Sequence, residues 1–300
     1  AGPRPGDGGF LEAFAMTLPL VTPAPPPGMT AMRATGLALL AALAWGSGNV
    51  AQKTILLDLD PLLASGVTAL IGGAILVPFA LREAGDPALP PARGSGLLLV
   101  TVGLAFTLAA TTLQVGYGLT TVTNAGFLVN TAAVLTPILA WMWLRERPAA
   151  AIWPASLLTL LGVFLMARAP WAGLAPGDAL TLLAALCFAI WTLLVGAYVT
   201  RFRRPILMTV VQLWLCGALS TALGLLMAGL PTQTALRLAL PEILYLGIVS
   251  KGLAYVLMAI AQQKVSASCA GVLVSAEAVF GAMAAALILG ETLGLLQGAG

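Results

Sequence analysis

The chain has 300 residues, of which 60% are hydrophobic and only 8% are charged, and its formal net charge at pH 7 is +3. Because a soluble domain carries roughly 25% charged residues, this composition excludes an ordinary soluble fold, and the small net charge argues against a nucleic-acid partner. The chain contains no histidine, no P-loop motif and no CxxC pair. We therefore expect an all-α polytopic membrane protein that is not an enzyme and has no cofactor and no metal site.

The first 32 residues differ in composition from the rest of the chain. Residues 1–9 are rich in glycine and proline, and further prolines crowd residues 23–27, so neither stretch can form a spanning helix. We expect residues 1–32 to be a non-spanning segment. It is disordered, lies at the membrane interface, or is in part a tag left from expression.

Apolar segments of spanning length begin at residue 34, and charged residues, prolines or glycines separate them. With a cytoplasmic N-terminus, ten Lys and Arg residues lie on the cytoplasmic side and three on the other, as the positive-inside rule requires. A tenth segment begins at Leu293 and has only 8 residues, so we expect it to be truncated in this chain and to continue beyond Gly300 in the natural protein. The nine complete segments are residues 34–55, 62–81, 96–119, 123–144, 152–167, 179–199, 206–228, 240–262 and 267–289.

Two of these segments resemble each other. Residues 125–146 align without gaps with residues 270–291, and nine of the 22 positions are identical. The fourth span then corresponds to the ninth, and an odd number of spans per half inverts the second copy in the membrane. Chance similarity between apolar segments is the alternative. We expect ten transmembrane helices as a five-plus-five inverted repeat, with one repeat at 33–168 and its inverted copy at 177–300. Secondary transporters recurrently follow this plan.

Two charged residues lie in the middle of spans. Lys251 is halfway along residues 240–262, and Glu277 is halfway along residues 267–289. An ionisable group near the bilayer midplane costs from about 3 to over 10 kcal/mol, so it indicates a functional site by default. Because the two spans are consecutive and antiparallel, these side chains can meet at one depth. Three explanations stay open: a structural ion pair, contact with the carboxylate or ammonium of a substrate, and, for Glu277, carriage of a coupling proton.

Aromatic and polar residues inside the spans complete the predicted substrate site. Aromatic faces can stack on an apolar substrate and attract an ammonium group, although most membrane tryptophans pack or anchor at the interface. Polar side chains there require partners, and hydrogen bonds between helices are the alternative explanation for them. The predicted substrate-binding residues are Trp45, Asn49, Asn130, Trp191, Lys251, Tyr255, Ser275 and Glu277.

Short motifs mark particular spans in both halves of the chain. The first half has Ala44-Trp45-Gly46-Ser47, Thr136-Pro137 and Leu144-Arg145-Glu146-Arg147, and the second has Ser250-Lys251-Gly252-Leu253-Ala254-Tyr255, Glu277-Ala278-Val279 and Leu289-Gly290-Glu291-Thr292-Leu293. As a set they resemble the drug/metabolite transporter superfamily in its EamA branch. The sequence is most similar to the YddG-type exporters of aromatic amino acids. That family often has proline where Ala278 stands, so we expect no kink in this span.

The resemblance implies a membrane transporter that exports small amphipathic metabolites, aromatic and other neutral amino acids among them, by alternating access. It also implies the bacterial cytoplasmic (inner) membrane as the location. A proton-coupled efflux carrier of other substrates and a non-transporting membrane receptor or scaffold are the alternatives. The expected partners are a small-molecule substrate and the lipid bilayer, with no nucleic acid. Gly294 and Gly298 form a GxxxG motif, which favours close helix packing and, as the alternative, dimerisation. The chain is therefore expected to be a monomer or a homodimer.

Overall fold

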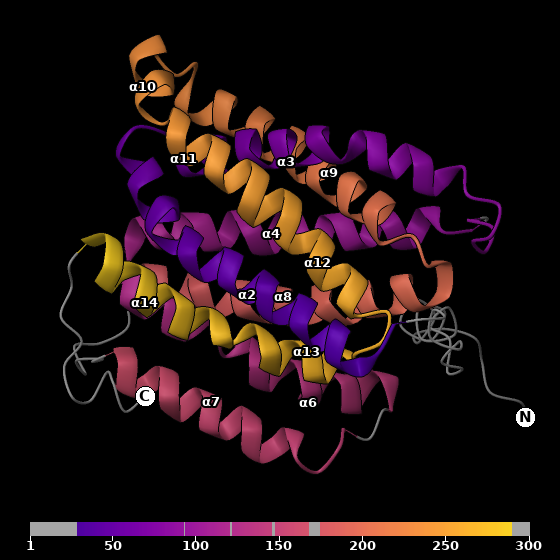
Figure 1. The fold of residues 1–300 in the computed structure, drawn as a ribbon. Coiled ribbons are helices and arrows are strands. Elements are labelled where there is room, and N and C mark those ends of the chain that lie inside the picture. The colour runs from indigo at the N-terminus through magenta and orange to yellow at the C-terminus, as the bar shows by residue number, and fades with distance from the viewer. Residues whose placement is uncertain (1–28, 93, 121, 146–147, 168–174, 290–300) are drawn as a thin grey trace, which may run out of the picture.

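The computed structural model describes residues 29–92, 94–120, 122–145, 148–167 and 175–289. Within these ranges the regular elements are all helical and no strand occurs. The long helices run side by side as a bundle (Figure 1). Residues 1–28, the tenth predicted span from Leu293, and Glu146 and Glu291 lie outside the described residues.

Six helical segments in the described part of the chain are long and apolar enough to cross a bilayer. Each corresponds to one of the spans predicted from the sequence. A short helix that the sequence did not predict, α10 (Gln233–Leu238), precedes the last of them. The six are α2 (Ala31–Thr54) with η1 (Ile55–Leu57), α3 (Pro61–Ala84), α4 (Gly96–Leu119), α8 (Pro176–Phe202), α9 (Pro205–Ala228), and the continuous run of α11 (Leu240–Tyr245), π-helical η2 (Leu246–Leu253) and α12 (Ala254–Ala261).

The fourth and ninth predicted spans are each broken into two helices, and the fifth is the shorter helix α7 (Ile152–Ala167). The fourth consists of α5 (Val122–Val129) and α6 (Ala132–Leu144), and the ninth of α13 (Ala267–Val274) and α14 (Ala276–Leu289). In the alignment of the two halves, Val129 corresponds to Val274. The two breaks therefore fall at equivalent positions of the sequence.

A side-chain hydroxyl lies at each break and bonds back to the preceding turn. The Thr131 hydroxyl donates to the Leu128 carbonyl at 2.6 Å, and the Ser275 hydroxyl donates to the Val272 carbonyl at 2.6 Å. The same two carbonyls also accept the backbone N–H of Thr131 at 3.1 Å and of Ser275 at 3.2 Å. The hydroxyl bonds therefore compete with the regular helical ladder at a turn that is already tightened. The ninth span is interrupted at Ser275 although Ala278 stands where a proline is common.

The halves of the chain pack against each other reciprocally. Helix α2 packs on α12 and α14, and helix α8 packs on α4 and α6. Helices α3 and α9 lie along each other through small residues (Figure 1). A Cβ atom added at Gly217 of α9 would come within 2.6 Å of the Leu70 side chain, so this glycine allows the close approach.

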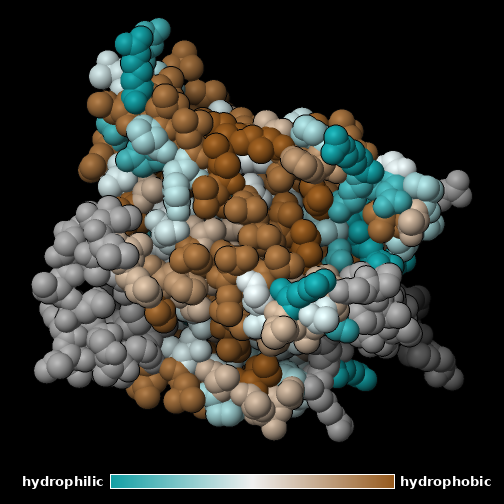
Figure 2. Space-filling view, viewed as in Figure 1, coloured by the Kyte–Doolittle hydropathy of each residue, from teal (hydrophilic) through white to brown (hydrophobic). Residues whose placement is uncertain are grey.

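The outer surface of the bundle is largely apolar. Hydrophobic residues cover the middle of the visible face, and hydrophilic residues gather toward the helix ends (Figure 2). Exposed leucines such as Leu108 and Leu158 belong to this surface. A wide apolar belt between polar ends is the surface that a lipid bilayer requires of a protein that crosses it.

Candidate functional site

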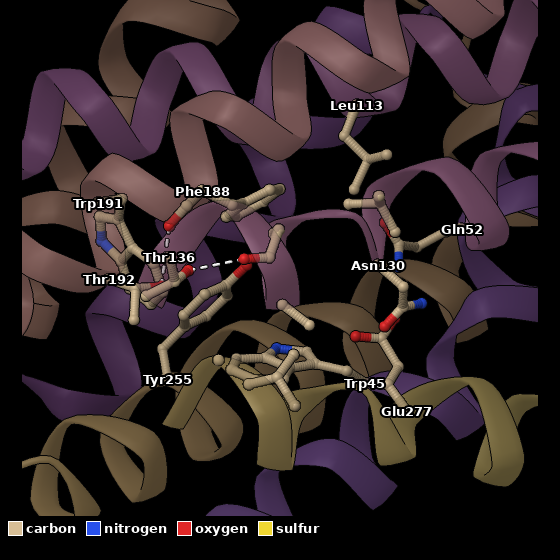
Figure 3. Close-up of a pocket in the computed structure, with 15 residues that line it drawn as sticks. Trp45, Gln52, Leu113, Asn130, Thr136, Phe188, Trp191, Thr192, Tyr255 and Glu277 are labelled. Carbon is tan, nitrogen blue, oxygen red and sulfur yellow. Dashed lines mark hydrogen bonds between the residues drawn. The ribbon is translucent and has the colours of Figure 1, made fainter. Parts of the chain in front are cut away.

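A cavity of about 90 Å³ lies where the two broken helices meet α2, α8 and α12 (Figure 3). Residues from both halves of the chain form its wall. Because the breaks fall here, the cavity lies beside the irregular backbone that membrane proteins tolerate only in protected or cavity-lining places. The lining residues are Trp45, Gln52, Leu113, Val129, Asn130, Ala132, Ala133, Thr136, Phe188, Trp191, Thr192, Tyr255, Gly271, Val274 and Glu277.

The two ends of the cavity differ in chemistry. Figure 3 shows Glu277, Asn130 and Gln52 together at one end, and Phe188 and Trp191 at the other. The hydroxyls of Thr136 and Thr192, which line the wall, already donate hydrogen bonds to backbone carbonyls. Thr136 donates to the Ala132 carbonyl at 2.7 Å, and Thr192 donates to the Phe188 carbonyl at 2.8 Å. The end with Glu277 is therefore suited to a polar group, and the other end to an apolar one.

Tyr255 is the centre of an aromatic cluster. The centroid of its ring lies 4.9 Å from that of Trp45, 5.4 Å from that of Trp191 and 4.8 Å from that of Phe106, each in an edge-to-face arrangement. Such pairs add about 0.5–1.5 kcal/mol each beyond the burial of their area. These contacts stabilise the arrangement of the rings, whose faces can contact an apolar or cationic group.

Hydrogen bonds hold both indoles of this cluster in place. The Trp45 indole N–H donates to the Ser250 carbonyl at 2.9 Å, and the Trp191 indole N–H donates to Gln212 Oε1 at 2.8 Å. All four residues are buried. A tryptophan whose N–H has a partner inside the protein does not need the membrane interface, so neither residue is an interfacial anchor.

Glu277 lies in the first turn of α14, and its hydrogen-bond partner is the neutral side chain of Asn49. Asn49 in turn accepts a hydrogen bond from Gln52 Nε2 at 3.2 Å and from the Tyr117 hydroxyl at 3.4 Å. This network fixes the amide but brings no positive charge to the carboxylate. Within the described residues, Glu277 forms no ion pair.

Lys251 lies in a second, smaller cavity of about 30 Å³ that adjoins the first. Its Nζ atom lies 3.5 Å from Ser65 Oγ and 5.6 Å from the centroid of the Phe106 ring. No ion pair joins it to Glu277, although the structure describes both side chains. The structural ion pair considered from the sequence is therefore wrong, because η2 turns Lys251 toward α3 whereas Glu277 lies beside α2.

The structure places the eight predicted site residues in four different settings. Trp45, Asn130, Trp191, Tyr255 and Glu277 line the larger cavity, and Lys251 lines the smaller one. Asn49 is buried behind Glu277. Ser275 faces away from both cavities, with its hydroxyl 3.2 Å from Thr159 Oγ1 on α7.

Several lining residues were not predicted from the sequence. Gln52 lies about one turn beyond Asn49, and Phe188 lies about one turn before Trp191, so both share a helix face with a predicted residue. This spacing is the signal that could have found them. No cluster of metal-binding side chains occurs among the described residues.

The chain is similar to transporter sequences along most of its length. The sequence model of the EamA-like transporter family matches residues 32–168 and again residues 175–300. An uncharacterized transporter of Methanothermobacter thermautotrophicus is 25% identical over 278 residues, which cover 87% of this chain and 80% of that relative. An uncharacterized transporter of Archaeoglobus fulgidus is 27% identical over 265 residues, with the same 87% and 80% coverage. One crystal structure shares the fold with a TM-score of 0.72 at 18% identity, covering 88% of this chain and 91% of the other.

Proposed function

Since the chain belongs to the EamA-like transporter family, and is thus a multi-pass membrane transporter, we propose that it exports small amphipathic metabolites by alternating access. Aromatic and other neutral amino acids are the proposed substrates. The observation that carries this proposal is the cavity with a carboxylate at one end and aromatic rings at the other. The motifs that resemble YddG-type exporters support the same substrate class.

The size of the cavity supports substrates of this class. A water-sized atom needs about 10–15 Å³ of such space, so the 90 Å³ cavity holds roughly 6 to 9 non-hydrogen atoms. The adjoining 30 Å³ adds about 2 or 3 more. The two spaces together hold about 8 to 12 non-hydrogen atoms, which suits leucine and reaches phenylalanine at the upper limit, whereas a much larger drug requires the cavity to open further.

Glu277 is the proposed partner of the substrate's ammonium group. A carboxylate at this depth with only a neutral amide beside it lacks the positive charge that would stabilise it. An ammonium group supplies that charge, and the faces of Trp45 and Tyr255 add cation–π attraction. A proton can also neutralise Glu277, and for this reason proton-coupled transport is the second candidate function.

The proposed architecture is ten transmembrane helices in two repeats, residues 33–168 and 177–300, of which the second is inverted. The equivalent positions of the two helix breaks and the reciprocal packing of α2 and α8 support it. In alternating access the two halves move around a site between them, and this cavity has residues of both halves in its wall. The proposed location is the bacterial inner membrane, with the N-terminus in the cytoplasm.

Efflux from proteoliposomes tests the proposal. Vesicles that contain the purified protein are loaded with labelled phenylalanine or leucine and diluted into buffer, with and without a pH gradient. We expect efflux faster than from empty vesicles, and a response to the gradient identifies proton coupling. Efflux of drugs or other metabolites but no amino acid would exclude amino-acid export, and no flux of any compound would favour the receptor or scaffold.

A further inference from the structure

We propose that the cavity beside Lys251 is a carboxylate site, through which the transporter selects zwitterions over amines of the same shape. The inference rests on the proposed function and extends it, because a carrier of amphipathic amines needs only the larger cavity. It assigns opposite groups of one substrate to the two adjoining cavities: the ammonium to Glu277 and the carboxylate to Lys251.

The first argument is the charge of Lys251, which the surrounding protein does not balance. Among the described residues, the polar partner of its Nζ atom is Ser65 Oγ, at 3.5 Å. The centroid of the Phe106 ring lies 5.6 Å from Nζ. Neither carries a negative charge, and within the described part of the chain Lys251 forms no ion pair. Even for a half-buried ammonium, the lack of a counter-ion is unfavourable, so an anionic ligand group would be stabilised here.

The second argument is the size and position of the small cavity. Its 30 Å³ holds roughly 2 or 3 non-hydrogen atoms, which is the size of a carboxylate group and too small for a whole metabolite. The two spaces adjoin, because five residues line both of them: Trp45, Gln52, Leu113, Phe188 and Tyr255. One bound molecule can therefore place its carboxylate at Lys251 while the rest of it occupies the larger cavity.

The third argument is the backbone that positions Lys251. The residue lies in π-helical η2, and π-helical turns occur frequently at functional sites. Gly72 of α3 lies directly against this segment, since a Cβ added there would come within 2.6 Å of the Gly247 carbonyl and 3.1 Å of Lys251 Cβ. A glycine at this position lets η2 approach α3 closely, so that Lys251 lines the cavity while its Nζ atom lies 3.5 Å from Ser65 Oγ.

Equilibrium binding to the purified full chain tests the inference with two probes that differ only in the carboxylate, phenylalanine and phenethylamine. We expect the wild-type protein to bind phenylalanine more tightly by about tenfold or more, the order expected of a charge-assisted hydrogen bond. Lys251→Met should remove this preference by weakening phenylalanine binding while leaving phenethylamine binding unchanged. Binding rather than flux is measured because a free amine leaks through lipid.

Lys264→Met is the matched control, because it removes the same charge from an exposed turn after α12. It should leave both affinities unchanged. If Lys251→Met does not yield monodisperse protein, Lys251→Gln takes its place with the same expectation. Equal wild-type affinity for the two probes, or an equal loss of both in the Lys251 variant, overturns the carboxylate site while the proposed function stands. Binding of phenethylamine without any neutral amino acid overturns both.

Discussion

The rings of Trp45 and Tyr255 meet edge to face, with centroids 4.9 Å apart and an angle of 60° between their planes. Both side chains line the larger cavity and the cavity of Lys251, so this pair forms part of the boundary between them. Trp45 belongs to the first half of the chain and Tyr255 to the second. A movement of one half relative to the other, as in the proposed alternating access, would therefore change this boundary.

Trp45→Phe tests what the hydrogen bond of the Trp45 indole contributes to stability, separately from its aromatic ring. The substitution keeps an aromatic face beside Tyr255 but leaves the Ser250 carbonyl without its indole donor. We expect the free energy of unfolding to fall by about 0.5–1.5 kcal/mol, measured by thermal denaturation in detergent. Trp141→Phe is the control, since Trp141 is 57% exposed, and equal effects of the two variants would contradict a structural role for this bond.

Glu277→Gln tests the ammonium site. Glutamine has the same shape and can still bond to the Asn49 amide, so the protein should fold normally. Without the negative charge, efflux of phenylalanine from proteoliposomes should fall by about tenfold or more, which corresponds to about 1.4 kcal/mol of lost binding. Glu242→Gln is the control, because Glu242 pairs with Thr54 away from both cavities. Unchanged efflux by the Glu277 variant would exclude the carboxylate from substrate binding.

Gly46→Ala tests the close packing of α2 on α14. A Cβ at Gly46 would lie 2.5 Å from the Glu277 carbonyl oxygen and 2.8 Å from the Gly281 nitrogen, both of them backbone atoms that cannot easily move. We expect a loss of about 1–3 kcal/mol in stability and reduced efflux, because the helix that carries Glu277 is displaced. Gly36→Ala on the same helix has nothing within 4 Å and should be neutral or slightly stabilising. Equal stability of the two variants would contradict this packing.

Glu83→Ala tests the junction between α3 and α9. The Glu83 carboxylate accepts the backbone N–H of Leu207 at 2.7 Å and that of Ile206 at 3.3 Å, so it caps the start of α9. Loss of such a cap should lower the free energy of unfolding by about 0.5–2 kcal/mol, again seen as a lower melting temperature. The neighbouring Arg82 is exposed, and Arg82→Ala should leave the melting temperature unchanged. A Glu83 variant that melts like wild type would show that other contacts hold this junction.

Features that depend on local composition could be predicted from the sequence. The six long apolar helices and the placement of Lys251 and Glu277 inside helices follow from the order of apolar and charged residues. The EamA family was indicated by the resemblance of short motifs. The relation between the halves was also visible, because residues 125–146 and 270–291 are similar. Burial of a hydrophobic segment depends on its own residues, and this is why such features need no knowledge of the fold.

Features that depend on how the helices approach and rotate could be decided only by the tertiary structure. The sequence allowed Lys251 and Glu277 to meet at one depth, but η2 directs one toward Ser65 and α14 places the other beside Asn49. Ser275 was a site candidate, yet its hydroxyl bonds to the backbone of a broken helix. The face that a membrane helix presents is set by contacts with distant segments, such as Gly72 against Gly247. Such contacts leave no periodic pattern in an all-apolar helix, so only the packed structure separates the two charges into neighbouring cavities.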